Sequence, residues 1–207
     1  MLKSLVKDCD RFGKIVDVVG ADWKGPLHQH EGAARYLEGS TIPRKINVAA
    51  DWLKSRITAG DSILDLGCYG GYLYDWLIAQ KADGFIYTGV DFNISEAAKA
   101  HWRSSAYFVQ RDILDYTEPA DYVFCARVLM HQPDPIVVID HAVSLAKRAA
   151  VFVTTVWEER IIRKQVFPTG STYKTTLTKN ELNKRYEIEW IEYKDNPNKY
   201  STFVVRP

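Results

Sequence analysis

Short apolar segments alternate with segments of helical pattern through the middle of the chain, and this alternation limits the possible folds more than any other feature. The apolar segments are SILDL, FIYTGVD, AYFVQ, DYVFCA and AAVFVTTV, at residues 62–66, 85–91, 106–110, 121–126 and 149–156. They are continuously apolar, which is typical of strands buried on both faces of a parallel sheet. The sequence therefore predicts a doubly wound α/β domain.

The segments between these strands carry helix signals. Residues 46–57 repeat apolar side chains at helical spacing, and residues 72–80 form a second amphipathic segment directly after the first strand. Three pairs of residues mark further helix starts: Asn93 with Glu96, Thr178 with Glu181, and Asp134 with Pro135. The first two pairs have capping-box spacing, and the third is a cap followed by a first-turn proline. We expect the helix that begins at Asn93 to end near Trp102.

The C-terminal part of the chain departs from the alternation. The segments EIEWIEYK and YSTFVVRP are joined by DNPN, a turn-rich sequence typical of an antiparallel hairpin. We therefore expect a mostly parallel seven-stranded sheet that closes with an antiparallel C-terminal hairpin. Residues 46–207 make up this Rossmann-like domain, and residues 1–45 are a helical or loop extension that could act as a lid.

Residues 157–180 form a long connection after the fifth parallel strand. Long loops at the carboxyl edge of such a sheet often select the substrate. The basic residues in this segment include Arg160, Arg163, Lys164 and Lys174. They could favour an anionic substrate, although a solvated basic loop is the more common explanation.

Composition excludes several classes of protein. The formal net charge is +1, which gives no sign of a broad polyanion-binding surface, so a nucleic-acid partner is possible but not favoured. The three cysteines, Cys9, Cys68 and Cys125, are scattered and suggest a reducing compartment. No apolar run suits a signal peptide or a membrane span. We expect a cytoplasmic protein.

A glycine-rich turn follows the first strand, at the point where a doubly wound sheet binds its ligand. Glycines 67, 70 and 71 lie between the strand and the next helix, and Asp65 precedes them. Asp91 ends the second strand, where a carboxylate can accept hydrogen bonds from a ribose diol. Together these residues indicate a nucleotide-like cofactor. A plain tight turn, with Asp91 as a helix cap, is the alternative.

Four motifs in chain order resemble those of the class I S-adenosylmethionine-dependent methyltransferases, over roughly residues 45–207. They are ILDLGCYGG, YTGVDFN, FVQRDILDY and DYVFCARVLMHQPDP. The dinucleotide pattern GxGxxG and the phosphate loop GxxxxGK[ST] are both absent. The family loop is usually GxGxG, and Tyr69 replaces its middle glycine here.

The resemblance implies S-adenosylmethionine as the cofactor and S-adenosylhomocysteine as the product. Asp91 would hold the ribose, Asp112 would accept a hydrogen bond from the adenine amino group, and Ile113 would pack on the ring. Cys68 would be a small filler beside the cofactor. The cofactor-binding residues expected from the motifs are Asp65, Gly67, Cys68, Gly70, Gly71, Asp91, Phe92, Asp112 and Ile113.

The fourth motif supplies the residues that would face the methyl acceptor. His131 lies just past the fourth strand, and its neutral imidazole could act as a catalytic base near neutral pH. Alternatively, His131 only shapes the loop before Asp134. Arg127 could face the cofactor pocket or form an ordinary salt bridge. Cys125 stands where metal-dependent catechol enzymes of this family have a carboxylate, so we expect no metal ligands.

The sequence therefore predicts metal-independent methyl transfer to an oxygen or nitrogen atom of a small-molecule acceptor. The chain lacks [DNS]PP[FWY] after the fourth strand and any Pro-Cys dipeptide, which argues against DNA amino and cytosine C5 methylation. The alternatives are an RNA or protein methyltransferase and a non-catalytic S-adenosylmethionine-binding module. A nicotinamide oxidoreductase is a more distant rival.

Overall fold

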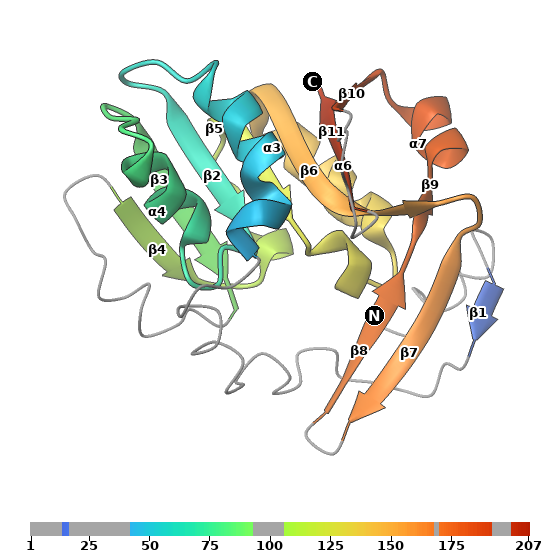
Figure 1. The fold of residues 1–207 in the computed structure, drawn as a ribbon. Coiled ribbons are helices and arrows are strands. Elements are labelled where there is room, and N and C mark those ends of the chain that lie inside the picture. Colours follow the sequence, from blue (N-terminus) through green and yellow to red (C-terminus); the bar gives the residue numbers. More distant parts are fainter. Residues whose placement is uncertain (1–13, 17–41, 93–105, 168–169, 192–199) are drawn as a thin grey trace.

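A parallel sheet forms the centre of the computed structural model, which describes residues 14–16, 42–92, 106–167, 170–191 and 200–207 (Figure 1). Its parallel strands are β2 (Ser62–Leu66), β3 (Ile86–Asp91), β4 (Ala106–Gln110), β5 (Ala120–Ala126) and β6 (Ala146–Trp157). They pair in the order β4-β3-β2-β5-β6, and every pair is parallel. The predicted parallel core is confirmed.

The C-terminal hairpin is also confirmed. Strand β11 (Tyr200–Val205) runs antiparallel to β6, and β10 (Ile188–Ile191) runs antiparallel to β11. The path of seven strands is therefore β10-β11-β6-β5-β2-β3-β4, and the short strand β9 (Leu177–Thr178) adds to the end of β6. The chain moves outward from β2 to β4, then returns to β5 on the other side of β2. This reversal makes the β2–β5 junction the topological switch point.

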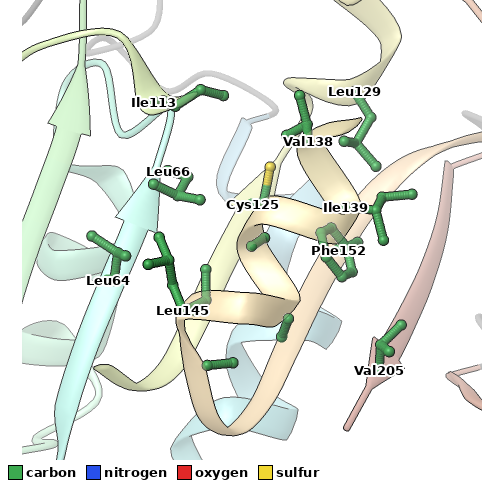
Figure 2. Close-up of a cluster of buried hydrophobic side chains, with 14 of the residues drawn as sticks. Leu64, Leu66, Ile113, Cys125, Leu129, Val138, Ile139, Leu145, Phe152 and Val205 are labelled. Carbon is green, nitrogen blue, oxygen red and sulfur yellow. The ribbon is translucent and has the colours of Figure 1, made fainter. Parts of the chain in front are cut away.

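Helices cover both faces of the sheet (Figure 1). Helices α3 (Ile42–Lys54) and α4 (Tyr72–Ala79) pack on one face, and α6 (Pro135–Leu145) and α7 (Lys179–Arg185) pack on the other. Side chains alternate between the two faces along each strand, so Ile63 joins the α3–α4 cluster whereas Leu64 joins the α6–α7 cluster. Figure 2 shows the second cluster, with Ile139 of α6 near Phe152 of β6.

Local capping signals explain where two of these helices begin. The Asp134 carboxylate accepts a hydrogen bond from the Ile136 N–H at 3.1 Å, and Pro135 occupies the first turn of α6. The Thr178 hydroxyl accepts one from the Glu181 N–H at 3.1 Å and so caps α7. Both predicted helix starts are confirmed. The predicted helix that begins at Asn93 lies outside the described residues.

The connection after β6 is structured, which the sequence analysis did not predict. Strands β7 (Ile161–Phe167) and β8 (Gly170–Thr175) form an antiparallel hairpin, and β1 (Lys14–Val16) pairs with β7 in parallel. Ile162 and Tyr173 are buried at its base. Figure 1 shows the hairpin projecting from the body of the domain.

The division at residue 45 stays a prediction. The described part of the extension consists of β1 and the start of α3, which begins at Ile42 and so crosses the expected boundary. Within the described residues, the helices are all too short or too polar to cross a membrane.

Candidate cofactor and acceptor site

The glycine loop lies at the switch point, directly after β2. Three of its residues have positive φ angles: Gly67 at 82°, Tyr69 at 44° and Gly71 at 73°. The Gly67 and Cys68 N–H groups both donate to the Val90 carbonyl, at 2.7 and 3.2 Å, and the Gly71 N–H donates to the Cys68 carbonyl at 2.8 Å. The loop is therefore hydrogen-bonded to the end of β3 and curls into the start of α4.

The structure gives a physical reason for two of the glycines. A Cβ atom on Gly67 would lie 2.1 Å from Val128 Cγ2, and one on Gly71 would lie 2.9 Å from Phe108 Cζ. These contacts are too close for any other residue, and both φ angles favour glycine. The side chains of Val128 and Phe108 therefore favour glycine at these two positions. From the sequence, the glycines were predicted to make room for a ligand. The ring of Tyr69 lies 6.5 Å from that of Tyr72.

Asp91 joins the loop to the second strand. It ends β3, is 8% exposed, and its Oδ2 accepts a hydrogen bond from the Tyr69 N–H at 3.0 Å. Phe92 follows, and its carbonyl accepts from Gln110 Nε2 of β4 at 3.2 Å. The acid that the sequence analysis assigned to the ribose therefore lies in contact with the glycine loop.

Asp65 lies beneath the loop. It is 4% exposed, and its Oδ2 accepts a hydrogen bond from the Tyr87 hydroxyl at 2.6 Å. Burial raises the pKa of Asp65 to about 7, and the nearby Asp91 carboxylate adds to the effect. Cys68 is also buried, and it packs closely on Gly89. A Cβ atom added to Gly89 would lie only 2.7 Å from the Cys68 Sγ. Burial also raises the pKa of the Cys68 thiol, so the thiol is a poor nucleophile in the folded protein, and its role beside the cofactor stays a prediction.

Helix α4 presents an uncapped N-terminus to the same edge. Gly71 is its N-cap residue, and within the described chain no side chain caps it. The first N–H groups of a helix have no partner inside the helix, so this end can bind an anion such as a carboxylate. Gly70, just before the cap, brings the backbone close to Tyr72: a Cβ there would lie 3.1 Å from the ring.

The third predicted binding segment follows β4. Asp112 caps the short helix η2 (Ile113–Asp115), and its Oδ1 accepts from the Leu114 N–H at 3.1 Å. Ile113 is 5% exposed and packs into the cluster shown in Figure 2. The structure therefore brings the predicted residues to the carboxyl ends of three neighbouring strands, β2, β3 and β4.

His131 lies at the carboxyl end of β5, next to the glycine loop. It ends the short helix η3 (Leu129–His131), is half-buried, and its N–H donates to the Val128 carbonyl at 2.9 Å. Val128 is the residue that a Gly67 side chain would strike, so the two turns are in contact. Cys125 precedes this turn but is fully buried in the core, where Figure 2 shows its sulfur among apolar side chains.

The β7–β8 hairpin packs against η3, and sequence reasoning missed this part of the site. The Thr175 hydroxyl of β8 donates to the Gln132 carbonyl at 2.6 Å. Arg160, at the base of the hairpin, is buried and pairs with Glu181 and Asp134. It is therefore not a solvated loop residue. The β-branched residues on either side of Pro168 were the available signal for a hairpin.

A protein-family model described as a methyltransferase domain matches residues 33–203. The chain belongs to this methyltransferase family. The predicted resemblance is thereby confirmed, and the match covers the glycine loop, Asp91, Asp112 and His131.

Curated relatives and solved structures agree with this family. Ubiquinone biosynthesis O-methyltransferase of Histophilus somni is 30% identical over 108 residues, which cover 45% of this chain and 44% of the relative. The Vibrio vulnificus (strain YJ016) protein of the same name is 30% identical over 145 residues, 63% of this chain and 60% of the relative. The chain thus spans roughly half the length of the curated relatives it matches.

Two solved structures share the fold. Magnesium protoporphyrin IX methyltransferase from Synechocystis PCC 6803, solved with bound S-adenosylmethionine, has a TM-score of 0.69 and 18% identity, with 92% of this chain and 100% of that chain covered. The 1,6-didemethyltoxoflavin-N1-methyltransferase of Burkholderia thailandensis has a TM-score of 0.67 and 16% identity, with 92% of each chain covered.

Proposed function

We propose that the protein transfers a methyl group from S-adenosylmethionine to an oxygen or nitrogen atom of a small molecule, without a metal ion, in the cytoplasm. The observation that carries the proposal is the hydrogen bond between Asp91 and the Tyr69 N–H. It places a buried carboxylate from the second strand against the glycine loop of a methyltransferase-family chain.

The residues present suit this cofactor. S-adenosylmethionine supplies an activated methyl on a sulfonium, so the protein mainly has to bind and align. Asp91, next to the glycine loop, would accept from the ribose diol, and the start of α4 would bind the carboxylate of the methionine part. Asp112 would accept from the adenine amino group, while Phe92 and Ile113 would pack beside the ring.

His131 is the proposed base. It stands at the end of β5, between the glycine loop and the β7–β8 hairpin, and a neutral imidazole there could take the proton of a hydroxyl or amine acceptor. The names of the relatives support a small acceptor: one group carries the name ubiquinone biosynthesis O-methyltransferase, and one solved neighbour is an N1-methyltransferase.

The Asp91→Asn variant tests cofactor binding. An asparagine keeps an acceptor for the Tyr69 N–H but removes the charge and one of the two oxygens. We expect calorimetry to show S-adenosylmethionine binding weakened by about tenfold or more, as for loss of a charge-assisted hydrogen bond. Asp83→Asn, an exposed carboxylate in the loop before β3, is the matched control. Equal affinity of Asp91→Asn and the control would refute the ribose assignment.

The His131→Ala variant tests catalysis. With an acceptor found by screening hydroxyl and amine compounds, we expect formation of S-adenosylhomocysteine to slow by about 100-fold, because general base catalysis contributes that much or more. Affinity for S-adenosylmethionine should stay within about twofold of wild type. An unchanged rate would leave His131 with only a structural role. Binding of the cofactor without turnover on any acceptor would favour the non-catalytic module.

A further inference from the structure

Arg127 has a backbone conformation that is unusual for its residue type. It follows β5 directly, and its φ angle is 62°, in the left-handed region that long side chains seldom occupy. Its N–H donates to the Val153 carbonyl of β6 at 2.7 Å, which holds it in place. Such conformations tend to occur at functional sites, where the surrounding structure maintains them. The position of Arg127 is therefore a candidate functional site.

The guanidinium of Arg127 has no anionic partner within the described part of the chain. Its Nε is buried and without a hydrogen bond, and none of its nitrogens forms an ion pair there. Its Cζ lies 5.7 Å from the centre of the Tyr200 ring. A cation–π contact offsets only part of the cost of desolvating a cation. The described residues therefore leave the capacity of this guanidinium to bind an anion unused.

The direction of the side chain separates it from the predicted cofactor residues. Tyr200 begins β11 and pairs with Thr155 near the end of β6. Strands β5 and β6 lie between β11 and β2, so β11 is about 14 Å from the glycine-loop strand at a spacing of about 4.8 Å per strand. The Arg127 guanidinium therefore lies near β11, on the side of β5 that is away from β2.

We propose that Arg127 recognises an anionic group on the methyl acceptor, a carboxylate or a phosphate. The planar guanidinium can bind either group through two parallel hydrogen bonds. The Tyr200 ring lies beside the guanidinium, so an aromatic ring is already close to the proposed anion site. This inference rests on the proposed methyl transfer and adds to it the chemical class of the acceptor and a residue that selects it.

Three probe compounds test the proposal on the full chain saturated with S-adenosylhomocysteine. Benzoate and phenyl phosphate carry the two anionic groups, and benzamide is their neutral match. We expect the wild type to bind at least one anion about tenfold more tightly than benzamide, as a charge-assisted hydrogen bond implies.

In the Arg127→Asn variant, the preference for an anion over benzamide should disappear. Asparagine tolerates a positive φ angle, so the backbone can keep its conformation. Arg185→Gln, an exposed arginine on α7, controls for loss of charge.

Affinity for S-adenosylhomocysteine is measured first, on every variant. Its absence in the wild type contradicts the proposed function, whereas a lost anion preference with normal cofactor affinity supports the Arg127 assignment. The assignment is overturned if the wild type shows no preference for either anion, or if Arg127→Asn keeps it. It is also overturned if Arg127→Asn loses cofactor affinity to the same extent, since Arg127 would then bind the cofactor's own carboxylate. If Arg127→Asn does not fold, Arg127→Lys, which lacks the planar fork, is judged by the same results.

Discussion

At the scale of single residues, the fold disfavours the charged form of the Asp65 carboxyl. Its carboxyl is surrounded by the Tyr87 hydroxyl, the Asp91 carboxylate and the Cys68 thiol, with its pKa raised to about 7 chiefly by burial. The folded state therefore holds a proton that the unfolded chain releases near pH 4. Between these values the unfolded chain binds fewer protons, so stability falls as pH rises from about 4 to about 7.

Replacing Asp65 by Asn should remove this pH dependence. The amide oxygen can still accept from Tyr87, and no charge has to be buried. We expect Asp65→Asn to be more stable than wild type above pH 7, by an amount on the order of 4 kcal/mol at most, and nearly equal to it at about pH 4. Urea unfolding at several pH values measures the difference, with Asp83→Asn as control. A wild-type slope that persists in Asp65→Asn would show that another group is responsible.

At the scale of elements, the β7–β8 hairpin is anchored to two helices by one buried arginine. Arg160, just before β7, pairs with Glu181 in the first turn of α7 and lies 3.6 Å from Asp134, the cap of α6. All three side chains are largely buried. Removing one partner from such a group leaves the others as uncompensated charges.

Arg160→Met should therefore be strongly destabilising. Methionine fills similar space but leaves two carboxylates without their cation, and we expect a loss of about 3–5 kcal/mol in the free energy of unfolding. Arg148→Met is the matched control, because Arg148 pairs with Asp61 at the surface, and its unfolding midpoint should change little. Chemical denaturation of both variants makes the comparison. Equal, small losses would mean that the hairpin does not depend on Arg160.

At the scale of the whole molecule, two apolar clusters stabilise one sheet from opposite faces. Leu53 of α3 belongs to the first cluster and Ile139 of α6 to the second, and both are fully buried. Strands β5 and β6 contribute side chains to both clusters. Damage to either face should therefore weaken the entire domain, since neither cluster can form without the shared strands.

Leu53→Ala and Ile139→Ala should each lower the free energy of unfolding by about 2–4 kcal/mol, as buried truncations do. Each variant should still unfold in one transition, seen equally by far-UV and near-UV circular dichroism. Val137→Ala, at an exposed position of the same helix as Ile139, should change stability by less than about 0.5 kcal/mol. Two separate transitions in either variant would show that the faces fold independently.

The parallel sheet, its C-terminal hairpin and the caps at Asp134 and Thr178 could all be predicted from the amino-acid sequence. These features follow from interactions between residues close in the chain: a continuous apolar run predicts a strand buried on both faces, and a cap side chain bonds an N–H two or three residues away. The order of the methyltransferase motifs could also be predicted from the sequence. It places Asp91 at the end of one strand and Asp112 just after the next strand, and the structure has both residues at these positions.

Features that depend on residues far apart in the chain could not be predicted in this way and emerge only in the folded molecule. Gly67 has to be glycine because Val128 lies against it, and Arg160 is buried because Asp134 and Glu181 converge on it. The orientation of Arg127 depends on Tyr200, which the hairpin brings beside β6. The local sequence pattern does not identify such partners, because they meet only when the strands assemble into the sheet, whose order differs from their order in the sequence.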